Sequence, residues 1–160
     1  MPTTQTPPTS APALHARGIL AALVPASATK PAYAVITIPG SSYALHLLPL
    51  GDAGALAGRI GARVTGTIEC SARRVDLVGA GGRYVEPVLG RPRRVQGSII
   101  AIDAAANTLI LNAGGATVVD GLPLPIRVKL TDARQQAAQF ALGACVSMDV
   151  LDGATFTLAP

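Results

Sequence analysis

The chain has 160 residues, of which 49% are hydrophobic but only 3% aromatic and 14% charged, and its formal net charge at pH 7 is +4. No uninterrupted apolar stretch approaches the roughly 20 residues of a membrane-spanning helix. The N-terminus lacks a basic region followed by a hydrophobic core, so we expect no signal peptide and a cytoplasmic location. A charged fraction well below the roughly 25% of typical soluble domains leaves little polar surface, which suggests burial in an oligomer or a larger complex.

The second half of the chain repeats the first half in the same order. Residues 17–23 recur as 96–102, residues 50–53 as 130–133, and residues 61–64 as 143–146, with offsets of 79, 80 and 82. A period this long indicates a duplicated domain and not a solenoid. We therefore expect a disordered tail over residues 1–13, a first unit over 14–78, a connector over 79–94 and a second unit over 95–160.

Short β-branched runs bounded by turn residues predict the strands of the first unit. These strands are expected over residues 16–24, 33–38, 43–48, 63–70 and 74–78. Between the third and the fourth strand, Ala53, Leu56 and Ile60 recur with the spacing of one helical face. This pattern predicts a short helix over residues 52–60 that ends at Gly61.

The second unit shows the same order of elements. Its strands are expected over residues 95–103, 108–112, 126–131, 146–150 and 155–158, with a loop over 118–123. Ile126 and Val128 alternate with Arg127 and Lys129, which predicts that the two basic residues face outward. Asp132 is the expected N-cap of a helix over residues 133–142.

The strand, helix and glycine sequence of the second unit resembles OB domains of the single-strand-binding type. The residues that carry this resemblance are 126–130, 132–140 and 143–150; in those domains a helix precedes a glycine that opens the fourth strand. The first unit resembles them more loosely. The resemblance implies a mostly β chain of two tandem small OB-like β-barrels, each with one short helix between strands 3 and 4. Two SH3-like barrels, or one mixed sandwich of about ten strands, are the alternatives.

Positive charge is concentrated where the two units meet. The segment 73–94 contains six arginines and two acids, so it carries the whole excess of +4. Guanidinium groups bind phosphates through paired hydrogen bonds, and a tyrosine beside them can stack on a base. The predicted nucleic-acid-binding residues are Arg73, Arg74, Arg83, Tyr84, Arg91, Arg93, Arg94, Arg127 and Lys129. The alternative is a β-ribbon or linker whose arginines pair with Asp76 and Glu86.

No catalytic or metal-binding pattern occurs in the sequence. The chain has no nucleophile elbow, P-loop, dinucleotide-binding glycine pattern or zinc-protease helix, and its two histidines, His15 and His46, are isolated. Cys70 and Cys145 lie in apolar strands outside any Cys-x-x-Cys pair, so we expect free thiols and no zinc site.

These observations favour a non-enzymatic protein, without cofactor or metal, that binds nucleic acid through phosphate contacts. Single-stranded DNA or RNA is the expected partner, although the scarcity of aromatic residues argues against stacking as the main source of affinity. One alternative is a structural subunit that self-associates or docks in a larger protein complex. Another is a small-ligand site at a barrel mouth.

Overall fold

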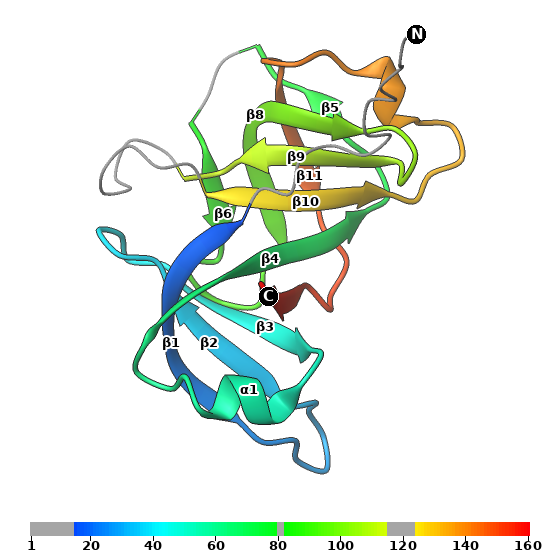
Figure 1. Ribbon diagram of the computed structural model, residues 1–160. Coiled ribbons are helices and arrows are strands. Elements are labelled where there is room, and N and C mark those ends of the chain that lie inside the picture. The colour runs from blue at the N-terminus through cyan, green and yellow to red at the C-terminus, as the bar shows by residue number, and fades with distance from the viewer. Residues whose placement is uncertain (1–14, 80–81, 115–123) are drawn as a thin grey trace, which may run out of the picture.

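The computed structural model describes residues 15–79, 82–114 and 124–160. The protein is mostly β, with 51% strand and 6% helix, and its strands join into one twelve-stranded mixed sheet (Figure 1). The expectation of a mostly β chain is thus confirmed. The predicted tail over residues 1–13 and the predicted loop over 118–123 lie outside the described residues.

The elements follow one another along the chain in two similar series. The first series is β1 (Ala16–Val24), β2 (Tyr33–Thr37), β3 (Ala44–Leu50), α1 (Ala53–Ala57), β4 (Arg63–Ala72) and β5 (Asp76–Leu77). The connector holds two short strands, β6 (Tyr84–Glu86) and β7 (Leu89–Gly90). The second series is β8 (Arg94–Asp103), β9 (Thr108–Asn112), β10 (Pro125–Leu130), the 3-10 helix η2 (Ala137–Gln139), β11 (Cys145–Asp149) and β12 (Thr155–Leu158).

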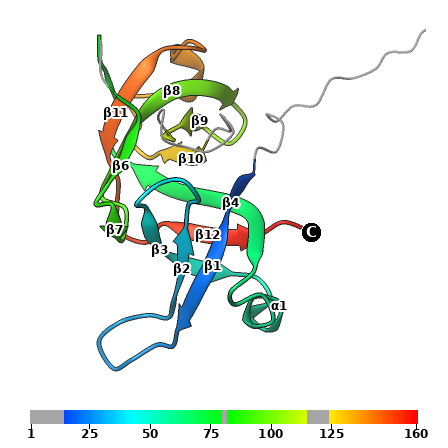
Figure 2. The same cartoon turned by 90° about the vertical axis from the view of Figure 1, so that its left-hand side faces the viewer.

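Five strands pair in a closed order, which we call the first circuit. β1 pairs with β2, β2 with β3, β3 in parallel with β12, β12 with β4, and β4 returns to β1. β12 comes from the C-terminal end of the chain, yet it lies between β3 and β4 (Figure 2). Its Phe156 is 1% exposed in the core, a burial that stabilises the fold by about 1.5–3 kcal/mol.

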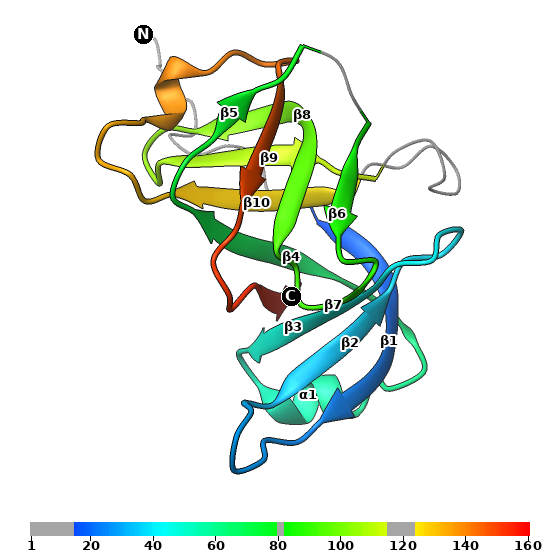
Figure 3. The same cartoon turned by 180° about the vertical axis from the view of Figure 1, so that it is seen from behind.

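A second circuit consists of β8, β9, β10, the far end of β4, and β11. β8 pairs with both β9 and β11, and β9 pairs with β10. Residues 69–72 of β4 pair in parallel with β10, and a bridge between Ala72 and Val150 links β4 to the end of β11. The long strand β4 therefore belongs to both circuits (Figure 3).

The strands predicted to close each unit pair elsewhere. The sequence places residues 155–158 with the second unit, but β12 completes the first circuit. Residues 74–78, expected to end the first unit, contribute β5, which pairs with β11 at the edge of the sheet. The reason is positional: β11 ends beside β4, and the turn at Gly153, with a φ of +107°, leads the chain on to β3 and β4.

Some backbone details recur at matching positions of the two series. β1 has a bulge just after Leu20, and β8 has one just after Ile99, 79 residues later. The N–H of Gly61 donates to the carbonyl of Leu20 at 2.7 Å. In the same way, the N–H of Gly143 donates to the carbonyl of Ile99 at 2.8 Å. The two glycines have φ values of +86° and +85°, a conformation that strains other residues.

The two predicted helices differ in outcome. α1 begins after Asp52, whose carboxylate accepts the N–H of Gly54 at 2.8 Å as an N-cap. Of residues 133–142, only the three of η2 are helical, so the longer helix predicted there is wrong. The side chain of Gln135 instead bonds to both the N–H and the carbonyl of Val75, each at 2.8 Å. This tertiary contact outweighs the weak helical preference of the segment.

Candidate nucleic-acid interface

The arginine-rich connector is part of the sheet and contacts both circuits. Its strand β6 pairs with β8 of the second circuit, and its strand β7 pairs in parallel with β3 of the first. The N–H of Val85 donates to the hydroxyl of Tyr43 at 3.1 Å, and the N–H of Ala44 donates to the carbonyl of Val88 at 2.8 Å. The backbone that carries the arginines is thus held at the junction of the two circuits.

Half of the six arginines in segment 73–94 pair with carboxylates. The pairs are Arg74 with Asp76 at 2.9 Å, Arg91 with Asp152 at 2.7 Å, and Arg94 with Asp149 at 2.8 Å. Hydrogen bonds with Tyr84 and Asp149 also raise the pKa of Arg94. All three pairs are exposed, so each contributes about 0–1 kcal/mol of stability, and a phosphate could replace the carboxylate.

The other three arginines of the segment lie on different elements. Arg73 follows β4, Arg83 precedes β6 and Arg93 precedes β8; all are exposed, and no carboxylate of the described residues pairs with them. Tyr84 is half-buried, and its hydroxyl donates to Gln96 at 3.1 Å. The predicted residues therefore do not form a single row along the sheet.

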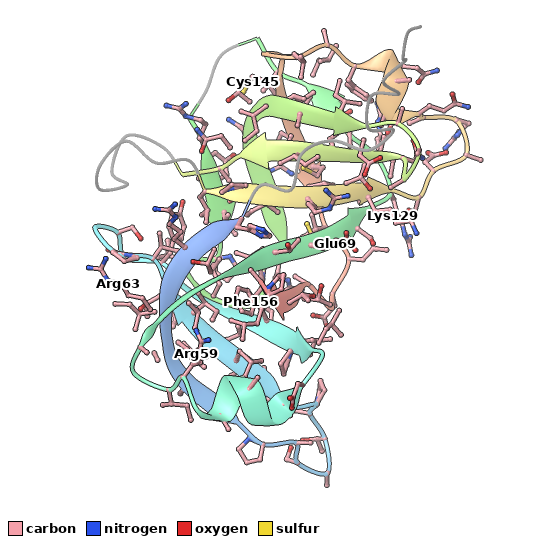
Figure 4. The ribbon with its side chains drawn as sticks, in the orientation of Figure 1. Arg59, Arg63, Glu69, Lys129, Cys145 and Phe156 are labelled. Carbon is pink, nitrogen blue, oxygen red and sulfur yellow. The ribbon has the colours of Figure 1, made fainter. Side chains whose placement is uncertain are left out.

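Arg127 and Lys129 share β10 but differ in environment. Lys129 is exposed (Figure 4). Arg127 is only 19% exposed; its Nη2 lies 3.1 Å from Asp103 Oδ2, and its Nε lies 3.4 Å from Glu69 Oε2. Asp103 is buried. A guanidinium between two carboxylates is already neutralised, so Arg127 offers no free charge to a phosphate.

A pocket that the sequence did not predict opens on the first circuit. It has a volume of about 240 Å³ and lies between the loop after β1, the strands β2 and β3, and the turn before β12. The rings of Tyr33 and His46 stack in its wall, with centroids 4.7 Å apart and planes at 19°. The sequence alone favours a structural role for His46, as an isolated histidine among leucines. The feature that could have predicted this contact is that both rings occupy half-buried, outward positions on neighbouring strands.

Positive charge surrounds the ring of His46. Burial, followed by the charges of Arg91 and Lys30, lowers the pKa of His46. The imidazole is therefore neutral at pH 7, where it can present its face to an aromatic group. Asp152 is the one carboxylate among the residues that line the pocket, and it is the partner of Arg91.

A second hollow, of about 300 Å³, shares Arg91 and Asp152 with this pocket. Arg93 and two prolines, Pro87 and Pro92, form part of its wall. We call the two hollows together the junction groove, and its polar residues are Lys30, Tyr33, His46, Arg91, Arg93 and Asp152. Three permanent cations and one carboxylate give the junction groove a net positive charge at pH 7. Of the predicted binding residues, it brings together Arg91 and Arg93.

Comparison with known protein families, curated proteins and solved structures finds no match for this chain. Among the described residues, no three metal-ligating side chains gather at one place. The helices in that part of the chain are too short or too polar to cross a membrane. The structure thus defines a mostly β protein with one mixed sheet, and any functional assignment depends on the junction groove itself.

Proposed function

We propose that the protein is a non-enzymatic binder of nucleic acid that holds phosphates with Lys30, Arg91 and Arg93 in the junction groove. The observation that carries the proposal is that these three cations line two adjoining hollows, one of which holds a stacked pair of rings. Lysine and arginine bind phosphates as charges, and arginine also does so through paired hydrogen bonds. The rings of Tyr33 and His46 supply a surface on which one base could stack.

The position of the junction groove supports this proposal. We take each circuit to be an OB-like barrel, because β4 pairs with β1 in the first circuit as β11 pairs with β8 in the second, and the strand taken from the other series completes each circuit. OB-folds bind oligonucleotides and oligosaccharides on strands 2 and 3 and on the loops between strands 1 and 2 and strands 4 and 5. The 240 Å³ pocket lies on β2 and β3, on the loop after β1 and on the turn before β12.

Binding of phosphates by a few exposed cations should depend strongly on salt. Each neutralised phosphate releases counterions, and three contacts to a single strand give a slope of about −2 in a plot of log affinity against log salt. The three described cations therefore predict moderate affinity at low salt and weak binding at high salt. A protein that used its surface only for packing would show no such slope.

The test is a pair of charge variants compared by fluorescence anisotropy with labelled single-stranded DNA, duplex DNA and RNA at low salt. Lys30→Gln with Arg93→Gln should lower affinity at least tenfold and flatten the salt slope. Arg59→Gln with Arg63→Gln removes the same charge from exposed residues that do not line the junction groove and that are labelled in Figure 4; this variant should change affinity less than threefold. An equal loss in both variants, or no binding by the parent protein, would overturn the proposal.

A structural role in a larger assembly is the second candidate. Large apolar side chains are exposed at several places, among them Leu77, Leu89 and Leu142, each about two-thirds exposed or more. Such side chains on a sparsely charged protein favour contact with other chains. Sedimentation of the purified protein separates the two candidates, because a discrete oligomer that shifts no nucleic acid at low salt would favour assembly.

A further inference from the structure

The strand registers of the two circuits match, so a residue in one circuit can be assigned an equivalent position in the other. In the first circuit, Val35 pairs with Ala22 on one side and with His46 on the other. In the second circuit, Ile110 pairs with Ala101 and with Arg127. Ala22 and Ala101 both follow the shared bulge. Arg127 therefore occupies in the second circuit the place that His46 occupies in the first.

The same register assigns counterparts to other residues around the pocket. Val24 pairs with Tyr33 at the end of β1, and Asp103 pairs with Thr108 at the end of β8. Leu48 lies opposite Thr155, and its counterpart Lys129 lies opposite Ser71. Thr155 and Ser71 therefore occupy equivalent positions. Gly153 and Glu69, which lie two residues before them, are equivalent as well. The turn glycine that lines the open pocket is thus replaced by a carboxylate in the second circuit.

Two cations of the second circuit consequently lie where the first circuit has its pocket. Arg127 replaces His46, and Lys129 replaces the pocket-lining Leu48. Asp103, at the end of β8, and Glu69, on the adjacent strand β4, approach Arg127 at 3.1 and 3.4 Å. The carboxylate oxygens occupy the donor sites at which a phosphate oxygen would bind.

We propose that the second circuit contains an oxyanion site that its own carboxylates occupy, so that the repeat has one open site and one closed site. The ligand class of the closed site is a phosphate or a similar oxyanion, held by Arg127 and Lys129. That the open site binds phosphate rests on the proposed function. The closed site is inferred from the strand register and from the two ion pairs of Arg127.

The test replaces the carboxylates by their neutral isosteres in the full-length protein. Glu69→Gln with Asp103→Asn keeps side-chain size, and the amide oxygen of the new asparagine can still accept the N–H of Ala106, as Asp103 does at 3.1 Å. Titration with inorganic tripolyphosphate, followed by calorimetry at low salt, should show one more binding site per chain than the parent protein shows. Adding Arg127→Gln to this double variant should remove the extra site.

A control variant separates the site from a general change in charge. Asp52→Asn with Glu86→Gln also removes two negative charges, and asparagine caps a helix as well as aspartate does. This control should add no site. A folded double variant of Glu69 and Asp103 with the parent's number of sites would overturn the inference. If the parent protein bound no tripolyphosphate at all, the proposed function would be overturned. The inference would still predict one binding site in the double variant.

A milder variant covers the case in which the double variant does not fold. Glu69→Gln alone keeps the buried pair of Arg127 with Asp103 and removes only the more exposed carboxylate. Tripolyphosphate should then shift the Nε–Hε NMR signal of Arg127 in the variant and leave it unchanged in the parent. The absence of a shift in the folded variant would also overturn the inference.

Discussion

The guanidinium of Arg91 lies 2.7 Å from the carboxylate of Asp152 and so joins the connector to the turn between β11 and β12. Both side chains are more than half exposed, and the same ion pair forms the wall shared by the two hollows of the junction groove. A phosphate that bound Arg91 would have to compete with Asp152.

Asp152→Asn should therefore strengthen binding. The substitution removes the competing charge and leaves the guanidinium in place, so we expect affinity for a labelled oligonucleotide to rise about three- to tenfold at low salt. The free energy of unfolding should change by less than about 1 kcal/mol, because the pair is exposed. Anisotropy and urea denaturation measure the two effects. Asp76→Asn, which frees Arg74 outside the junction groove, is the matched control.

The pH dependence of binding should report the titration of His46. The folded pKa of His46 is lowered by burial, Arg91 and Lys30, but a bound phosphate would raise it again. Binding should therefore take up a proton and become tighter as the pH falls from 7 toward about 5.5. His46→Gln should bind with a weaker pH dependence in the same anisotropy assay. Identical pH profiles for the variant and the parent would place the bound phosphate away from this ring.

The same titration has the opposite effect on the stability of the unliganded protein. Between the ordinary pKa of histidine, about 6.5, and the lower folded value, the unfolded chain binds more protons. The contribution of His46 to stability is thus present above pH 6.5 and is lost as the pH falls through this window. The effect should be modest because the side chain is only partly buried. Urea denaturation of the parent and of His46→Gln across this range measures it.

Two glycines in the strands leave no space for a side chain. A Cβ at Gly66 would overlap the carbonyl of Thr157 and the ring of Phe156, and one at Gly97 would overlap the carbonyl of Asn112. Gly66→Ala and Gly97→Ala should each destabilise the protein by about 1–3 kcal/mol or more. Gly58→Ala is the control, because its Cβ would meet only ordinary contacts at 3.8 Å. Chemical denaturation followed by circular dichroism compares the three variants.

The exchange of strands should make the protein unfold as one unit. β12 completes the first circuit and β4 completes the second, so a substitution that loosens either strand should destabilise both circuits. Phe156→Ala should destabilise the protein by about 3–5 kcal/mol. Hydrogen exchange should then accelerate in β8–β10 as well as in β1–β3. Continued strong protection of β8–β10 in this variant would show that the second circuit folds independently.

The two free cysteines should differ sharply in reactivity. Burial, and secondarily the charge of Glu69, raises the pKa of Cys70 to about 12, whereas Cys145 is half-buried. A thiolate is the reactive form, so a disulfide reagent at pH 8 should modify only Cys145 in the folded protein. Mass spectrometry after labelling, with Cys145→Ser as the control, identifies the modified residue. Labelling of Cys70 at an equal rate would contradict the burial of β4.

The sequence by itself determined the mostly β character and most strand positions. Alternation and glycines such as Gly61 and Gly143 are local properties, which the chain carries wherever its strands pair. Asp52 could be predicted as a helix N-terminus for the same reason, since its carboxylate bonds to an N–H only two residues away.

Only the tertiary structure decided which strands are neighbours. Alternation tells which face of a strand is buried, but backbone hydrogen bonds do not depend on the side chain, so no pattern shows that β12 joins β3 and β4. The candidate binding residues follow the same rule. Arg127 was predicted as an outward cation, and two other strands, β8 and β4, supplied its partners Asp103 and Glu69. Lys30, His46 and Arg91 are distant in sequence, and only the packing of the connector and the last turn against the first circuit brings them to the wall of one pocket.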